Sequence, residues 1–191
     1  MSGCLIANSK TKTCETASKI GGVNGRLWLY NLKDSDGQKV TYTEVAGSNV
    51  ISDITFTTGE GLFPVEGEKY AHNFTYALAM PGVNKYYTQV GNIKTIVDTA
   101  DDITWLNEVC KASDLGAIYE DNNQRFIVLG QNNGLKAIES DLFDSGTEAA
   151  TDVGTTVSLQ GEEKDAPYKL FFDTDYDTTL AALVALEAPV A

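Results

Sequence analysis

The sequence predicts a mainly β fold, an antiparallel β-sandwich or barrel with one flanking α-helix at about residues 101–112. Short runs of β-branched and aromatic residues recur along the chain, and turns rich in Gly, Asp and Asn separate them. A helical pattern with capping residues interrupts these runs. At 191 residues, 42% of them hydrophobic, the chain has the size of a single domain with one sizeable core. We divide it into an N-terminal arm at 1–20, a β domain at 21–175 and a C-terminal tail at 176–191.

The first half of the β domain predicts four strands. Residues 1–20 are rich in Ser, Thr and Lys, which favours an extended arm, and the glycine pair at 21–22 ends it. Strands are expected at 26–30, 39–42, 50–56 and 72–79, with a turn at 34–37. A long loop at 57–70 separates the last two strands. Loops of this length in compact domains usually contact another surface, so we expect a contact there.

The second half predicts a fifth strand at 86–97, followed by the helix. Residues 99–102 supply a helix cap with negative charge. Apolar positions then recur at helical spacing at Ile103, Leu106, Val109 and Cys110. This spacing predicts that Cys110 is a packing residue and not a nucleophile.

Two strand pairs and an apolar tail complete the prediction. Strands at 115–120 and 124–129 form a hairpin around Asp121, Asn122 and Asn123, because these residue types tolerate positive φ. Strands at 155–160 and 168–173 are expected to close the fold as a pair. The tail at 179–186 contains helix formers and little polarity, so it must pack against this domain or against a neighbour.

The charge is large, negative and unevenly placed. The formal net charge is −13, and the half from residue 96 to 191 has 19 acidic and 5 basic side chains. An acidic surface repels phosphate backbones, which argues against sequence-specific nucleic-acid binding but allows DNA to pass along the surface without specific binding. A plain solvated acidic face that maintains solubility remains the alternative interpretation.

Cysteine and histidine usage argues against a metal centre. Three cysteines, Cys4, Cys14 and Cys110, cannot all pair, and with one histidine a structural zinc site is not expected. A disulfide between Cys4 and Cys14 would require secretion, and the first residues lack the features of a signal peptide. No run is long enough to span a membrane, so we expect reduced thiols, synthesis in a cytoplasm and no membrane partner.

Motifs for catalysis and for cofactors are incomplete, so we expect neither an enzyme nor a cofactor. His72 falls in a strand pattern without a nearby nucleophile signature. The segment at 59–64 lacks the third glycine of a dinucleotide motif, and the acidic segment at 173–177 lacks the glycine and glutamate of an EF-hand. Aromatic residues on strands leave open a soluble carbohydrate-binding β-sandwich; these are Trp28, Tyr30, Tyr86 and Tyr87.

Four segments, in this order, resemble a family of tailed-bacteriophage virion structural proteins. They are G-G-V leading into L-W-L-Y-N at 21–31, the hairpin at 116–130 with E-D-N-N-Q-R-F-I-V-L-G, the N-N-G-L at 132–135, and V-S-L-Q-G-E-E at 157–163. The resemblance covers about half of the chain. It implies a β-sandwich or barrel with a single flanking helix, and the role of a tail tube protein. A head–tail connector, tail terminator or capsid decoration role stays open.

The resemblance implies a virion location, hexameric rings stacked as a tube, and partners that include other copies and other tail or head–tail proteins. Part of the acid between residues 96 and 177 is then expected to face the lumen and keep DNA off the wall. The long loop and the tail are expected to make contacts between subunits, because their apolar side chains would otherwise face water. The residues predicted for these contacts are Leu62, Phe63, Pro64, Val65, Leu180, Leu183 and Leu186.

Overall fold

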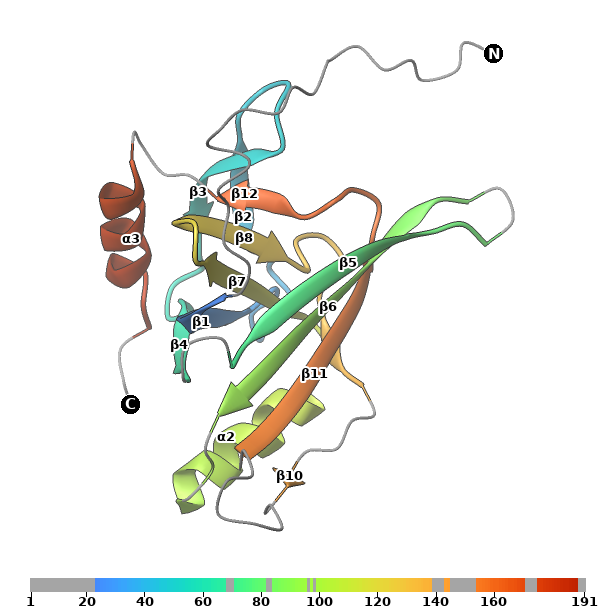
Figure 1. Cartoon of the computed structure of the whole chain (residues 1–191). Helices are drawn as coiled ribbons and strands as arrows, with labels where there is room; N and C mark the ends of the chain where they lie inside the picture. Colours follow the sequence, from blue (N-terminus) through green and yellow to red (C-terminus); the bar gives the residue numbers. More distant parts are fainter. Residues whose placement is uncertain are drawn as a thin grey trace.

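The computed structural model describes residues 23–67, 71–81, 84–95, 97, 99–138, 143–144, 154–170 and 175–188 (Figure 1). The prediction of a mainly β fold is confirmed, because the described strands form two sheets and two helices flank them. The elements in chain order are β1 (Val23–Asn31), β2 (Thr41–Glu44), β3 (Val50–Thr55), β4 (Phe63–Glu66), β5 (Asn73–Ala79), β6 (Tyr86–Thr95), α2 (Ala100–Lys111), β7 (Leu115–Asp121), β8 (Arg125–Leu129), β9 (Lys136–Ala137), β10 (Phe143–Asp144), β11 (Gly154–Glu163), β12 (Tyr168–Leu170) and α3 (Tyr176–Ala185).

The larger sheet has seven strands in the order β2-β3-β12-β8-β7-β1-β4, and the smaller sheet has the order β10-β11-β6-β5 with β9 beside β11. Pairing is antiparallel except between β12 and β3, which are parallel, so the larger sheet is mixed. The predicted pairing of 155–160 with 168–173 is wrong. β11 is bordered by β6 on one edge and by β9 and β10 on the other, which leaves no edge for β12. β12 lies instead between β3 and β8.

The larger sheet is the middle of three layers. Successive residues of a strand point to opposite faces. Leu27 and Leu29 of β1 therefore pack with the smaller sheet and α2, whereas Trp28 and Tyr30 pack with α3. Figure 1 shows α3 on one side of this sheet and β5, β6 and β11 on the other. Burial on both faces explains the continuous run of large apolar residues in β1, and it raises the pKa of Tyr30 well above its usual value.

Helix α2 begins where the sequence predicts it. The Thr99 hydroxyl accepts a hydrogen bond from the Asp102 amide at 3.1 Å, and the Asp102 carboxylate accepts one from the Thr99 amide at 2.8 Å. This reciprocal capping box satisfies amides that lack a partner within the first turn. Val109 is buried, and Cys110 packs against the same core, which confirms the packing role predicted from its spacing.

The predicted β7–β8 hairpin is confirmed, although its turn differs from the expected one. The Asp121 carboxylate accepts hydrogen bonds from the amides of Asn123 at 2.8 Å and Arg125 at 3.0 Å, and it also pairs with the Arg125 guanidinium. Positive φ occurs at Gln124, at 57°, and not at the three residues expected from the sequence. The Asp121 side chain accepts hydrogen bonds from the amides of the turn, and the positive φ that completes the turn occurs at its last residue, Gln124.

Two of the segments that carry the family resemblance contact each other and join the two sheets. Glu163, at the end of β11, is buried, and its Oε1 accepts hydrogen bonds from the amides of Asn132 at 2.9 Å and Asn133 at 2.8 Å. These asparagines belong to the loop after β8. A Cβ added to Gly161 would lie 2.3 Å from the carbonyl oxygen of Gly134, so the same contact requires glycine. We call this arrangement the Glu163–loop contact.

The C-terminal tail packs on its own domain. Leu183 of α3 is 0% exposed within the core on the outer face of the larger sheet. Tyr176 stacks on Phe126 at a centroid distance of 5.4 Å and donates a hydrogen bond to Glu120 at 2.7 Å. Of the two partners that the sequence left open for this tail, its own domain or a neighbour, the structure shows the first, because an apolar face of the larger sheet receives it. The N-terminal arm at 1–20 lies outside the described residues.

Candidate functional site

The residues predicted at subunit contacts from the C-terminal tail are used within the chain. Leu183 is fully buried, and Leu180 and Leu186 are half-buried against the same core cluster. The Leu186 carbonyl also accepts a backbone hydrogen bond from Leu62 at 2.9 Å. The tail and the loop at 57–70 therefore meet inside one chain, and a contact with another subunit through these leucines is not needed to cover them.

The loop at 57–70 contains strand β4, and only part of it faces water. The expectation that Leu62 and Val65 are exposed is wrong, since they are 0% and 6% exposed. The reason is that β4 adds to the edge of the larger sheet beside β1, where Val65 packs into the core between the two sheets and Leu62 packs into the core beneath α3 on the opposite face. Phe63 is 42% exposed and Pro64 is also exposed. These two residues remain available for a contact with a neighbour.

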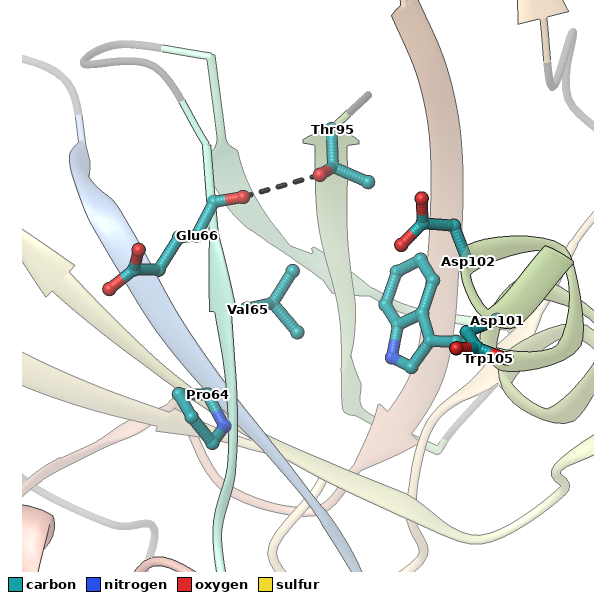
Figure 2. Close-up of a pocket in the computed structure, with 7 residues that line it drawn as sticks. All are labelled: Pro64, Val65, Glu66, Thr95, Asp101, Asp102 and Trp105. Atoms are coloured by element: carbon teal, nitrogen blue, oxygen red, sulfur yellow. Dashed lines mark hydrogen bonds between the residues drawn. The ribbon is translucent and has the colours of Figure 1, made fainter. Parts of the chain in front are cut away.

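Pro64 and Val65 line an open pocket of about 340 Å³ between β4 and α2. Figure 2 shows Val65 and the indole of Trp105 facing each other across it. On one side the Thr95 hydroxyl donates to the Glu66 carbonyl at 3.2 Å, which ties the end of β6 to β4. We call this cavity the Trp105 pocket; its lining residues are Pro64, Val65, Glu66, Thr95, Asp101, Asp102 and Trp105.

The carboxylates of the Trp105 pocket differ in their partners. The Glu66 side chain pairs with Arg26 at 2.6 Å, and the Asp102 side chain takes part in the helix cap. Asp101 is exposed, and its carboxylate has no ion pair or hydrogen bond within the described part of the chain. The pocket thus combines an apolar floor with one acid that is free to meet a cation.

A second exposed feature lies at the other end of β6. Strands β5 and β6 form a long hairpin that projects past the larger sheet (Figure 1), and we call residues 73–95 the β5–β6 arm. Near its base, Phe74 packs on Tyr119 at a centroid distance of 5.5 Å. Farther out, Tyr76 and Leu78 continue the same face but are 53% and 52% exposed, and Met80 is 57% exposed. The face of the hairpin that carries Phe74 is therefore covered by the core at its base and exposed to water farther out.

The arm also has an unprotected edge. β5 ends the smaller sheet, and its outer edge pairs with none of the described strands. Proteins commonly protect such edges with Lys, Pro or a bulge. Residues 73–79 contain none of these, and Lys85 is the single charged side chain from residue 70 to residue 93. The arm is consequently an open and largely apolar edge that contains two lysines, Lys85 and Lys94, and no acidic side chain, in a chain with a net charge of −13.

Neither the projecting β5–β6 arm nor the Trp105 pocket was predicted from the sequence. A signal for the arm was present, because one charge in 24 residues is unusual in a chain whose charged fraction is 21%. The pocket had no such signal. It depends on β4 and α2 meeting in space, although 32 residues lie between Glu66 and Thr99 in the sequence.

The histidine and the acidic segment that the sequence analysis considered for chemistry both have structural partners. His72 is fully buried, and its Nδ1 accepts a hydrogen bond from the Lys94 amide at 3.1 Å, as an ordinary residue between strands does. Asp175 caps α3 by accepting from the Thr178 amide at 2.9 Å, and these bonds lower the pKa of its carboxyl. No group of three or more His, Cys, Asp or Glu in the described ranges is placed to hold a metal ion. None of the described helices is long and apolar enough to cross a membrane.

Comparisons of the chain with protein-family models, with curated proteins and with solved structures return no match.

Proposed function

We propose that this chain is a structural virion protein of a tailed bacteriophage, which assembles into stacked hexameric rings of a tail tube and conducts DNA during ejection. The observation that carries the proposal is the β5–β6 arm. A hairpin with an open edge and three large apolar side chains at 52–57% exposure is typical of a surface that another chain covers. The tail-tube assignment itself rests on the four segments that resemble virion structural proteins.

The charge distribution favours a second copy of this chain as the partner. Two copies that approach through ordinary parts of their surfaces bring like charges together, because each carries −13. The arm avoids this penalty, since residues 73–95 contain two positive charges and no negative one. Copies that meet through the arm can therefore bury apolar surface with little electrostatic cost.

The acidic surplus suits a conduit for DNA. Each phosphate contact by Lys or Arg would add affinity and slow transit, whereas carboxylates on the wall keep the duplex away. In a hexamer the acids of six subunits would surround the channel. We propose that part of the acid in the second half of the chain, with its 19 acidic and 5 basic side chains, faces this lumen.

The alternatives predict different particles. A head–tail connector or tail terminator would form single rings that do not stack, and a capsid decoration protein would remain a small oligomer until it meets a capsid. For a carbohydrate-binding β-sandwich the support is now weaker. Of its four aromatic residues, Trp28 and Tyr30 are 0% exposed, which leaves Tyr86 and Tyr87, both half-buried.

Negative-stain electron microscopy of the purified full chain tests the proposal. We expect rings about six subunits around and tubes made by stacking them, appearing as the protein is concentrated. Single rings without tubes would favour the connector or terminator role. Monomers at every concentration, together with binding to a glycan array, would refute the virion proposal and support the sugar-binding alternative.

A further inference from the structure

We infer that the tip of the β5–β6 arm docks in the Trp105 pocket of the next copy, where Met80 enters the pocket and Lys85 pairs with Asp101. This inference rests on the proposed function, because it requires copies of the chain to assemble. It names the surface on each side of the contact.

The arm tip and the pocket lie at opposite ends of the same strand. Ala79 pairs with Tyr86 at the tip, and Thr95, the last residue of β6, lines the pocket. The ten residues of β6 span roughly 30 Å at about 3.4 Å per residue. The arm therefore cannot reach the pocket of its own chain, and a contact between the two must join different copies.

Such a contact is heterologous, since one copy offers the tip and the other offers the pocket. Heterologous contacts repeat from copy to copy, and they close into rings or continue as a stack. Pairing of two β5 edges across a twofold axis would instead stop at a dimer. The placement of tip and pocket thus agrees with an assembly of many subunits.

The chemistry of the two surfaces is complementary. Met80 follows β5 directly and Lys85 directly precedes β6, so these two residues lie at the outer end of the arm. Met80 is 57% exposed, and a flexible thioether packs well into an irregular cavity lined by an indole. The Lys85 ammonium and the Asp101 carboxylate are both exposed, and neither has a polar partner among the described residues. Pairing them satisfies one free cation and one free acid at the rim of an apolar contact.

A charge exchange tests the pairing. The variants are Lys85→Glu, Asp101→Lys and the double variant, with Asp53→Lys on β3 as a control that has the same charge change far from the pocket. Asp102 is left intact because it caps α2. We expect each single variant to raise the concentration needed for assembly about tenfold, since a pair of opposite charges becomes a pair of like charges. The double variant should restore the original concentration, and Asp53→Lys should not raise it.

Photocrosslinking tests where on the neighbouring copy the tip of the arm binds. With p-benzoylphenylalanine at position 80, and a mixture of isotopically light and heavy chains, we expect adducts between different copies on peptides that contain residues 62–66 or 99–111. Adducts on the arm of another copy, or single variants that the double variant does not rescue, would overturn the inference while leaving assembly intact. Failure of the original chain to assemble would refute the proposed function itself.

Discussion

At the scale of single residues, Glu163 holds the loop after β8, because its carboxylate accepts hydrogen bonds from the amides of Asn132 at 2.9 Å and Asn133 at 2.8 Å. The second oxygen of its carboxylate has no hydrogen-bond partner among the described residues. A buried carboxylate that accepts backbone amides is a strong contact, because charged acceptors form stronger hydrogen bonds than neutral ones. Its role in this chain is to join the two sheets.

Replacement of Glu163 by Ala should therefore lower the free energy of unfolding by about 1.5 to 3 kcal/mol, because the loop amides of Asn132 and Asn133 lose their carboxylate acceptor. Glu162→Ala is the matched control, since this neighbouring side chain is exposed and only its backbone carbonyl is used, by Asn133 at 2.6 Å. Urea unfolding of both variants under monomeric conditions measures the difference. Equal stability of the two variants would show that the Glu163–loop contact does not hold the sheets together.

Among the secondary-structure elements, those determined by local chemistry could be predicted from the sequence. Helix α2 follows from the capping residues Thr99 and Asp102, and the β7–β8 hairpin follows from Asp121. The position of β12 could not be predicted, because both edges of β11 are already occupied by strands from elsewhere in the chain. Strand β4 was missed for a similar reason, since its pairing with β1 is a long-range contact.

The C-terminal helix could be predicted as an apolar element but not assigned to a partner. Its weakly polar sequence is equally suited to a neighbouring subunit and to the chain's own sheet. The structure places α3 on the outer face of the larger sheet, where Leu183 is 0% exposed. This helix is thus part of the monomer, and the surfaces left for assembly lie on the arm and beside β4.

Leu183→Ala should destabilise the monomer by about 2 to 5 kcal/mol, because it leaves a cavity in the core. Val184→Ala, one residue away and 43% exposed, should change the stability by less than about 0.5 kcal/mol. Thermal unfolding followed by circular dichroism at a concentration too low for assembly measures both. If Leu183→Ala left the monomer unaffected and weakened only the assembly, then α3 would serve a neighbour, as the sequence alone allowed.

At the scale of the whole molecule, the arm and the charge act in opposite directions. A net −13 on each copy opposes association, and this repulsion weakens as salt shortens the screening length to about 8 Å at 0.15 M. Under the proposed function, the arm supplies the apolar surface that drives association. We therefore expect assembly to depend on three exposed side chains that contribute little to the core of the monomer, namely Tyr76, Leu78 and Met80.

Sedimentation velocity at about 0.15 M salt tests this dependence most directly, with the original chain and two triple variants. One carries Tyr76→Ser, Leu78→Ser and Met80→Ser. The control carries Val45→Ser, Thr55→Ser and Val184→Ser, three changes at exposed positions outside the arm and the Trp105 pocket, of which the two valines are 45% and 43% exposed. We expect large assemblies from the original chain and the control, and a folded monomer of 20.6 kDa from the arm variant. Assemblies of the same size from all three proteins, or a monomer from the original chain at every concentration, would contradict the account.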